Sequence, residues 1–223
     1  MKHLKEYIVF RRFEKNNYPY REYFNKKKCI FIHIPKAAGT SVLTWISGSS
    51  KQYRDHAGWL TYYMRNPVKF ENYFKFTIVR DPLFRLFSAY NYIMQGGNKS
   101  AGDRELGDAL NDYLSFDDFV LNYLDQYRIQ EHLLFRPQYL FLCDWKLELK
   151  VDYVAHFEKI QEDLRFVKSK IAVNGEIPFL NISRAESAPT LVNFSDEVRN
   201  KIYTLYARDY SLFGYSKYNG EGC

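Results

Sequence analysis

The sequence predicts an α/β fold in which a mostly parallel sheet is flanked by helices. Three runs rich in β-branched and aromatic residues suit buried strands, and they lie at Cys29–Ile34, Phe74–Val79 and Val151–Phe157. Each run is followed by residues whose apolar positions recur at helical spacing. Because ligands of open α/β sheets bind at the carboxyl ends of the strands, the residues that follow these runs are the candidates for a functional site.

The first run leads into residues 35–41, which read Pro-Lys-Ala-Ala-Gly-Thr-Ser. The small residues let the backbone pass close to a ligand, and Thr40 and Ser41 begin a helix. Their N–H groups and hydroxyls would face an anion at the positive end of the helix dipole, where Lys36 adds a full charge. The loop therefore predicts a site for phosphate or a similar anion.

The order of residues differs from that of the best-known phosphate loop. In Gly-x-x-x-x-Gly-Lys-Ser/Thr the lysine stands directly before the hydroxyl residue. Here Lys36 precedes the small residues and no glycine stands upstream of them, so an ordinary nucleotide triphosphatase fits poorly. Taken alone, the loop is also compatible with a plain strand-to-helix turn that carries a chance lysine.

A second motif follows Phe74–Val79. Pro82 suits the first turn of a helix, and Asp81 is its predicted cap. The expected core face of that helix consists of Leu83, Leu86, Phe87 and Tyr90. Ser88 lies off this face, so Arg80 and Ser88 can converge on one more phosphate. An ion pair with Asp81 is the alternative for Arg80 alone, but two strand-loop-helix units that both carry anion-binding side chains favour a ligand site.

Residues 35–41 and the sequence Val-Arg-Asp-Pro-x-x-Arg-x-x-Ser-Ala-Tyr at 79–90 together resemble the paired motifs of sulfotransferases that use 3′-phosphoadenosine 5′-phosphosulfate (PAPS). The carbohydrate-type family, with its bacterial members and the heparan sulfate O-sulfotransferases, is the most similar. The resemblance runs from Cys29 to about Tyr215. It implies a P-loop-like sulfotransferase fold and transfer of a sulfuryl group from PAPS to a hydroxyl, on a saccharide, with release of adenosine 3′,5′-bisphosphate and no metal.

The resemblance also implies which residues bind the donor. In the family the first motif grips the 5′-phosphosulfate, and the matching residues here are Pro35, Lys36, Ala37, Ala38, Gly39, Thr40 and Ser41. Lys36 is also assigned a catalytic role, because it meets the charge that develops on the leaving phosphate oxygen. Arg80 and Ser88 take the 3′-phosphate, and Arg184 matches loosely a third loop that closes over the nucleotide.

His56 is the predicted general base. It lies between the two motifs in His-Ala-x-Trp, which resembles the segment that supplies the base in heparan sulfate 6-O-sulfotransferases. An imidazole with an unperturbed pKa of about 6.5 can take a proton from an acceptor hydroxyl at neutral pH. His33 and His156, both in strand-like runs, are interpreted as structural. Glu71 and Asp55 are the alternatives, Glu71 because some relatives use a glutamate.

Composition predicts one well-packed domain. The chain has 223 residues, of which 46% are hydrophobic and 18% aromatic, so residues 29–223 are expected to form a single sulfotransferase domain after an arm at 1–28. The net charge of +6 suits an anionic donor. No nucleic-acid-binding signature is visible, so nucleic acid is not an expected partner. The sequence does not fix the oligomeric state.

The cysteines and the N-terminus exclude other classes. Cys29, Cys143 and Cys223 are far apart and odd in number, so neither a disulfide scaffold nor a zinc site is predicted, and Cys29 is interpreted as a small buried apolar residue. Arg11 and Arg12 interrupt the apolar residues of the N-terminal stretch. Neither a signal peptide nor a membrane span is predicted there, and we expect a cytoplasmic form, unlike the Golgi members of the family.

Three later segments carry weaker predictions. The polar stretch Gln95–Arg104 is expected to be a solvent-exposed loop near the cleft, with a lid or an acceptor contact through Lys99 and Arg104 as the functional alternative. Arg136 and Gln138 are candidates for substrate contacts or for a purely structural role. A final helix is expected over Ser195–Asp209, with Ser195 as its cap.

Two alternative functions stay open on the sequence alone. One is a nucleotide or small-molecule kinase with a P-loop-like fold, for which ATP with Mg²⁺ would bind better than adenosine 3′,5′-bisphosphate. The other is a nucleotide- or glycan-binding module that keeps the fold without turnover. A comparison of the affinities for ATP and adenosine 3′,5′-bisphosphate distinguishes a kinase from a sulfotransferase. A measurement of sulfate transfer distinguishes a sulfotransferase from a binding module without turnover.

Overall fold

The computed structural model describes residues 17–50, 55–173, 175 and 194–217. They group into two compact units. The first unit comprises the described parts of Met1–Ile34, Ala38–Ile78 and Phe141–Phe179, and the second those of Pro35–Ala37, Val79–Leu140 and Leu180–Cys223. The prediction of a single domain over residues 29–223 stays a prediction.

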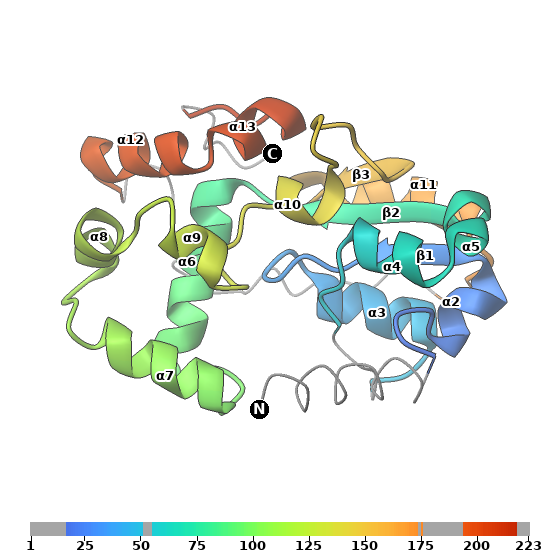
Figure 1. Ribbon diagram of the computed structural model, residues 1–223, viewed down its shortest axis with the longest axis horizontal. Coiled ribbons are helices and arrows are strands. Elements are labelled where there is room, and N and C mark those ends of the chain that lie inside the picture. The colour runs from blue at the N-terminus through green and yellow to red at the C-terminus, as the bar shows by residue number, and fades with distance from the viewer. Residues whose placement is uncertain (1–16, 51–54, 174, 176–193, 218–223) are drawn as a thin grey trace. The chain divides into compact units, whose positions relative to one another are not determined.

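A three-stranded parallel sheet forms the centre of the first unit (Figure 1). Its strands β1 (Cys29–Ile32), β2 (Phe74–Val79) and β3 (Tyr153–His156) lie in that order. β1 and β2 are parallel, with Cys29 opposite Phe74. All four residues of β1 are buried, as expected for a continuous apolar run in a sheet covered on both faces. The predicted α/β class with three strands is confirmed, although β1 and β3 are shorter than their apolar runs.

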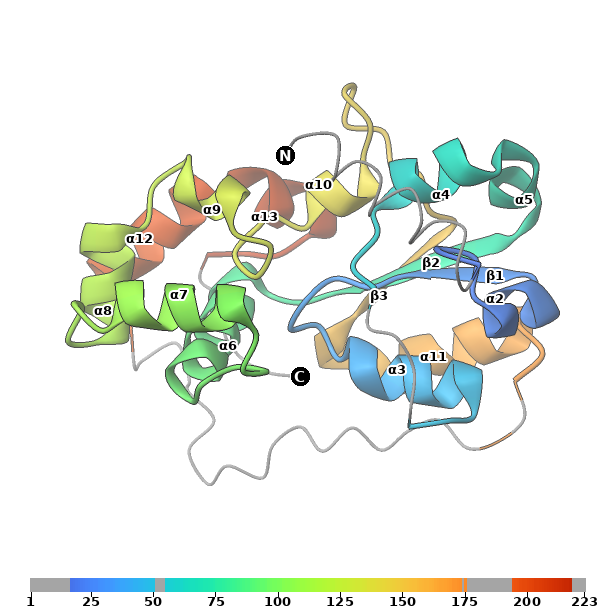
Figure 2. The ribbon, with the colours of Figure 1, turned by 60° about the horizontal axis from the view of Figure 1, so that its bottom comes forward.

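Helices cover both faces of this sheet (Figure 2). The helices of the first unit are α2 (Glu22–Lys27), α3 (Gly39–Ser47), α4 (Trp59–Arg65), α5 (Pro67–Asn72), the 3-10 turn η2 (Phe157–Lys159) and α11 (Ile160–Lys170). α3 and α11 lie on one face and α4 and α5 on the other. Ile160, Leu164 and Val167 of α11 are buried, as expected from the helical spacing of the apolar residues after the third run.

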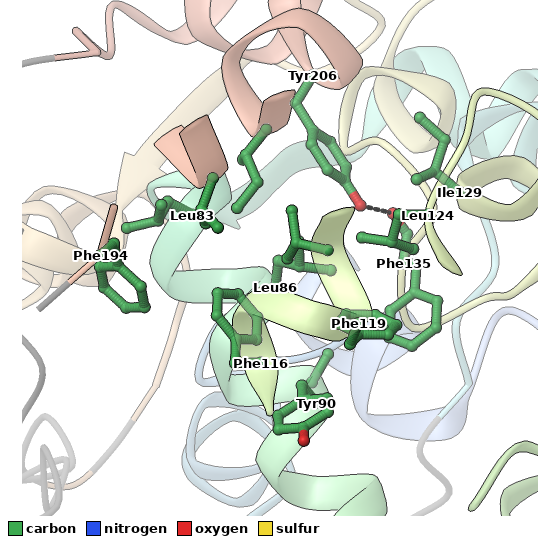
Figure 3. Packing of buried hydrophobic residues seen from close by; sticks show 14 of the residues in the cluster. Leu83, Leu86, Tyr90, Phe116, Phe119, Leu124, Ile129, Phe135, Phe194 and Tyr206 are labelled. Atoms are coloured by element: carbon green, nitrogen blue, oxygen red, sulfur yellow. Dashed lines mark hydrogen bonds between the residues drawn. The ribbon is translucent and has the colours of Figure 1, made fainter. Parts of the chain in front are cut away.

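The second unit is helical. It contains α6 (Pro82–Met94), α7 (Ala101–Leu110), α8 (Phe116–Asp118), the π-helix η1 (Phe119–Tyr123), α9 (Arg128–Glu131), the start of α10 (Tyr139–Leu142), α12 (Asp196–Leu205) and α13 (Ala207–Phe213). Leu83, Leu86 and Tyr90 of α6 are buried, as their spacing predicts. They pack in a cluster with Phe119, Tyr206 and other apolar residues (Figure 3).

Two predicted boundaries are wrong. The stretch Gln95–Arg104 is not loop throughout, because Ser100 accepts a hydrogen bond from the Asp103 N–H and α7 begins at Ala101. The final helix is not continuous, since Tyr206 separates α12 from α13 with a ψ of 23°. The O–H of Tyr206 donates to the Phe135 carbonyl over 2.7 Å, and this hydrogen bond holds the residue at which the two helices are separated (Figure 3).

In the parts of the chain that the structure describes, no helix has the length and apolar character that a membrane span requires.

Candidate active site

The loop between β1 and α3 has an unusual backbone. Lys36 has a φ of 65° and Ala38 a φ of 59°, so two residues with side chains adopt the left-handed conformation. Such residues cost about 1–3 kcal/mol each and cluster at ligand clamps. α3 then begins at Gly39, as the motif predicts, and Thr40 in its first turn is exposed. The tight turn thus leads directly into the N-terminus of a helix, where backbone N–H groups can bind an anion.

Gly39 is required by the close approach of His33. A Cβ atom at residue 39 would lie only 1.8 Å from Cδ2 of the His33 ring, a distance that no side chain can adopt. His33 is buried, with 5% of its surface exposed, so its ring cannot simply turn outward to make room. Packing against the imidazole therefore explains the glycine of the motif, and the interpretation of His33 as structural agrees with this position.

His56 lies against the same histidine. Its Nδ1 is 2.9 Å from the carbonyl oxygen of His33, and the two ring centroids are 4.3 Å apart. A carbonyl only accepts, so Nδ1 of His56 carries the proton and donates it. In the neutral imidazole the lone pair is then on Nε2. This hydrogen bond selects the tautomer that a general base at Nε2 requires.

Contacts on either side hold the segment that carries His56. Nε of Arg21, a residue with 6% of its surface exposed, donates to Oδ2 of Asp55 over 2.8 Å. The indole N–H of Trp59 donates to the Cys143 carbonyl over 2.9 Å. The His-Ala-x-Trp segment is therefore fixed at both ends, which favours a defined position for the imidazole.

The geometry disfavours the two alternative bases. The carboxylate of Asp55 is engaged by the buried Arg21. Glu71 is exposed in α5, just before the amino end of β2. Because β1 and β2 are parallel and in register, Glu71 lies at the amino edge of the sheet, opposite the edge where β1 leads to His33. His56 thus stays the strongest candidate.

In the second unit, the side chain of Lys36 is held by an aromatic ring. Its Nζ lies 4.3 Å from the ring centroid of Tyr92 in α6, within the range of a cation–π contact. The Tyr92 O–H donates to Oδ2 of Asp103 over 3.0 Å, and the Asn98 N–H donates to the same oxygen over 2.8 Å. A chain of contacts therefore connects the ammonium group of Lys36 to the turn before α7.

Arg80 is fixed by its backbone and reaches the first motif. Its N–H donates to Oε1 of Gln138 over 2.9 Å, and Nε2 of Gln138 donates back to the Arg80 carbonyl over 2.8 Å. One guanidinium nitrogen of Arg80 donates to the carbonyl oxygen of Lys36 over 3.4 Å. The two sequence motifs, 44 residues apart at this pair, thus meet within one unit.

A buried carboxylate supports this arrangement from behind. Asp209 of α13 accepts hydrogen bonds from the N–H groups of Gln138 over 2.8 Å and Tyr139 over 2.9 Å, and Gln138 and Asp209 are both fully buried. Burial raises the pKa of Asp209, while Arg85 and these hydrogen bonds oppose the rise. Gln138 is therefore held at both its backbone and its side chain, which favours a structural role over a substrate contact.

Two other arginines near the second motif are structural. Arg85 is fully buried and donates to the carbonyls of Leu134 over 3.1 Å and Arg136 over 2.8 Å. Burial lowers the pKa of Arg85, and carbonyl oxygens accept from both of its terminal nitrogens, while its buried Nε has no hydrogen-bond partner among the described residues. The guanidinium of Arg136 donates to the Gln130 carbonyl over 3.1 Å, so the structure favours the structural reading of Arg136 as well.

The remaining predicted residues have mixed outcomes. Asp81 caps α6 by accepting from the Leu83 N–H over 2.9 Å. Ser88 is half-buried on α6, and its convergence with Arg80 on one phosphate stays a prediction. Arg184 lies outside the described residues. Among those that are described, no group of three or more His, Cys, Asp or Glu side chains could hold a metal ion.

Sequence reasoning missed Tyr92 and Asp209 as parts of the site. Neither lies in a motif whose chemistry can be read locally, because Tyr92 acts on a residue 56 positions earlier in the chain and Asp209 on residues 70 and 71 positions earlier. Asp209 stands at the start of Asp-Tyr-Ser-Leu-Phe-Gly-Tyr at 209–215, which belongs to the region of family resemblance. The place of Asp209 in this region is the sequence feature that could have indicated its importance.

Comparison with known proteins agrees with this geometry. The model of the Sulfotransferase family matches residues 23–216, so the chain belongs to that family. Over 170 residues it is 25% identical to carbohydrate sulfotransferase 11 of Mus musculus, and the match covers 66% of this chain and 48% of that protein. The same protein of Rattus norvegicus matches with the same identity and coverage. The chain spans about half the length of these curated relatives.

Proposed function

We propose that the protein transfers the sulfuryl group of PAPS to a hydroxyl of a saccharide and releases adenosine 3′,5′-bisphosphate. Membership of the sulfotransferase family supports sulfuryl transfer, and the names of the matched relatives support a carbohydrate acceptor. The observation that carries the proposal is the contact between Arg80 and the Lys36 carbonyl. It joins the two motifs that the proposal assigns to the two phosphate ends of one nucleotide.

The loop fits the donor. The left-handed residues Lys36 and Ala38 and the side-chain-free Gly39 leave the backbone accessible for close approach to a phosphosulfate. In the proposed reaction the bond between sulfur and the phosphate oxygen breaks as the bond to the acceptor oxygen forms, so negative charge moves onto the phosphate. Lys36 and the loop N–H groups stabilise that charge. Arg80 and Ser88 hold the 3′-phosphate and so fix the position of the donor.

His56 completes the proposed mechanism on the acceptor side. Its Nδ1 donates to His33, and the lone pair on Nε2 takes the proton of the attacking hydroxyl. The acceptor oxygen thus becomes more nucleophilic as it attacks sulfur, and the proton ends on the imidazole.

Radiolabelled sulfate transfer tests the proposal. The full chain is incubated with ³⁵S-labelled PAPS and a panel of unsulfated and partly sulfated polysaccharides, and label in the polysaccharide is measured. The proposal expects transfer by the wild type and loss of transfer in Lys36→Ala. Lys146→Ala is the control, since Lys146 is an exposed lysine of the first unit that the proposal leaves outside the site. Hydrolysis of ATP with no label transferred to any acceptor would favour the kinase and reject the proposal.

A further inference from the structure

A polar pocket of about 380 Å³ lies in the second unit, and residues of α9, the start of α10 and the α12–α13 junction line it. Its polar lining residues are Gln126, Gln130, Tyr139, Thr204 and Arg208. The volume lies within the range of about 300–1,000 Å³ that small-molecule sites occupy. None of the roles assigned above to donor or base falls on these side chains.

The lining has the chemistry for a hydroxylated anion. Two carboxamides and two hydroxyls can both donate and accept, which suits the hydroxyls of a sugar. The guanidinium of Arg208 donates to the Tyr139 O–H over 3.0 Å and lies 5.3 Å from the ring centroid, so its plane is held in place. Arginine donors match carboxylate and sulfate oxygens, and no acidic residue is among the described residues that line the pocket.

The pocket shares its wall with the support of Arg80. Pro137 and Tyr139 line it, while Gln138 between them makes both backbone hydrogen bonds to Arg80. Arg208 lines it from α13, while the adjacent Asp209 accepts from the Gln138 and Tyr139 N–H groups. Two short segments, 137–139 and 207–209, therefore form the pocket on one side and the Arg80 support on the other.

We propose that this pocket binds a sugar unit of the acceptor chain that carries a carboxylate or a sulfate, with Arg208 pairing the anionic group. This inference rests on the proposed function, because it assigns the ligand to the acceptor of the same enzyme. The pocket then selects acidic polysaccharides over neutral ones through contacts away from the reacting hydroxyl.

Calorimetric titration tests the pocket without turnover. The probes are an unsulfated tetrasaccharide that contains uronic acid, a sulfated tetrasaccharide without uronic acid, and a neutral tetrasaccharide of the same length. We expect Arg208→Gln to weaken binding of at least one acidic probe about 10-fold or more, the effect of losing a hydrogen bond to a charged group. The neutral probe should be unaffected, and the acidic probe that loses affinity identifies the anionic group.

Controls separate the pocket from general charge and from the donor site. Arg165→Gln removes an exposed arginine of α11 in the first unit and should leave all affinities unchanged. Thr204→Glu, on the exposed part of the lining, should repel the acidic probes even if Arg208→Gln does not fold. Both pocket variants should still bind adenosine 3′,5′-bisphosphate like the wild type.

Three results would overturn the inference: unchanged acidic binding in Arg208→Gln and Thr204→Glu, an equal loss in Arg165→Gln, or equal loss for the neutral probe. Failure of the proposed function looks different. In that case the wild type does not bind adenosine 3′,5′-bisphosphate, whatever the saccharide titrations give.

Discussion

In the first unit, the buried residue His33 contacts both the loop that leads into α3 and the proposed base His56. His33 closes against Gly39 at the start of α3, and its carbonyl accepts the hydrogen bond that orients His56. A substitution at His33 would remove the ring that packs against both Gly39 and the His56 imidazole, whereas a substitution at His56 removes only the base. His56 is the better position for a test.

His56→Ala is expected to reduce turnover about 10²- to 10⁴-fold, the usual contribution of a positioned base. Affinity for adenosine 3′,5′-bisphosphate should stay within twofold, because His56 is assigned to the acceptor side. Steady-state kinetics and calorimetry measure the two effects separately. His156→Ala is the matched control, since this histidine lies at the carboxyl end of β3 and is not assigned to the reaction. Near-normal turnover in His56→Ala would place the base elsewhere.

Tyr92 is expected to position Lys36 through its ring rather than its hydroxyl. Tyr92→Phe keeps the face that lies 4.3 Å from the Lys36 ammonium and loses the hydrogen bond to Asp103. Tyr92→Leu loses the face, which is worth about 0.5–2 kcal/mol in a cation–π contact. We expect Tyr92→Leu to lower kcat several-fold with little change in KM for the acceptor, and Tyr92→Phe to restore most of it. Equal kinetics for both variants would exclude this role.

Local chemistry decides which residues the sequence could reveal. The side chains of Asp81 and Ser195 cap helices by accepting hydrogen bonds from backbone N–H groups two or three residues later. The residue type and its position before a helical pattern are therefore enough to predict the contact. Tyr92 and Asp209 act across more than 50 residues, and no spacing rule connects them with Lys36 or Gln138. Contacts of that kind become visible only when the fold brings the segments together.

Among the secondary-structure elements, the end of β2 is held by Gln138, which directly precedes α10. The side chain of Gln138 accepts from the Arg80 N–H and donates to the Arg80 carbonyl, as the backbone of a neighbouring strand would. Because Gln138 is fully buried, water cannot take over these bonds.

Gln138→Ala should therefore lower the free energy of unfolding by about 1–3 kcal/mol for each backbone group left without a partner. It should also weaken adenosine 3′,5′-bisphosphate, since Arg80 loses its support. Urea titration and calorimetry measure these effects. Gln130→Ala is the control, because Gln130 is exposed and its side chain donates only within its own segment, to the Gln126 carbonyl. Full stability and affinity in Gln138→Ala would show that the hydrogen bonds between Gln138 and Arg80 are dispensable.

Element types were easier to predict than element ends. The strands follow from continuous apolar runs, and α6 and α11 follow from regular apolar spacing. The break at Tyr206 does not follow from spacing, because the apolar positions continue through it while the Tyr206 hydroxyl is drawn to Phe135. The start of α7 was missed because glycines at 96, 97 and 102 resemble a loop, although Asp103 fixes the turn.

For the molecule as a whole, a buried thiol and a half-buried phenol are expected to lower the free energy of unfolding at alkaline pH. Burial raises the pKa of the Cys29 thiol from 9.0 to about 12, and burial raises the pKa of Tyr23 from 10.0 to about 12. The folded state thus favours the neutral forms. Their stabilisation is complete below the unfolded pKa values, near pH 9 to 10, and is lost as the pH rises toward 12.

The free energy of unfolding should accordingly fall between pH 9 and about 12, by up to about 4 kcal/mol from the Cys29 thiol alone. Urea titrations at pH 7, 9 and 10.5 measure the slope. Cys29→Ala should flatten it, although the variant is less stable at pH 7 because it leaves a small cavity in β1. A free energy of unfolding that stays constant up to pH 10.5 would contradict the assignment of these burial effects.

The most direct test of the account is a calorimetric comparison of adenosine 3′,5′-bisphosphate, adenosine 5′-phosphate and ATP with Mg²⁺. We expect the wild type to bind the bisphosphate most tightly. Arg80→Ala should weaken the bisphosphate by about 1.5–3 kcal/mol and adenosine 5′-phosphate much less, because only the former carries the 3′-phosphate. Arg165→Ala, at an exposed arginine of α11 in the first unit, should change neither. A preference for ATP, or equal losses for both adenosine ligands in Arg80→Ala, would contradict the proposed donor site.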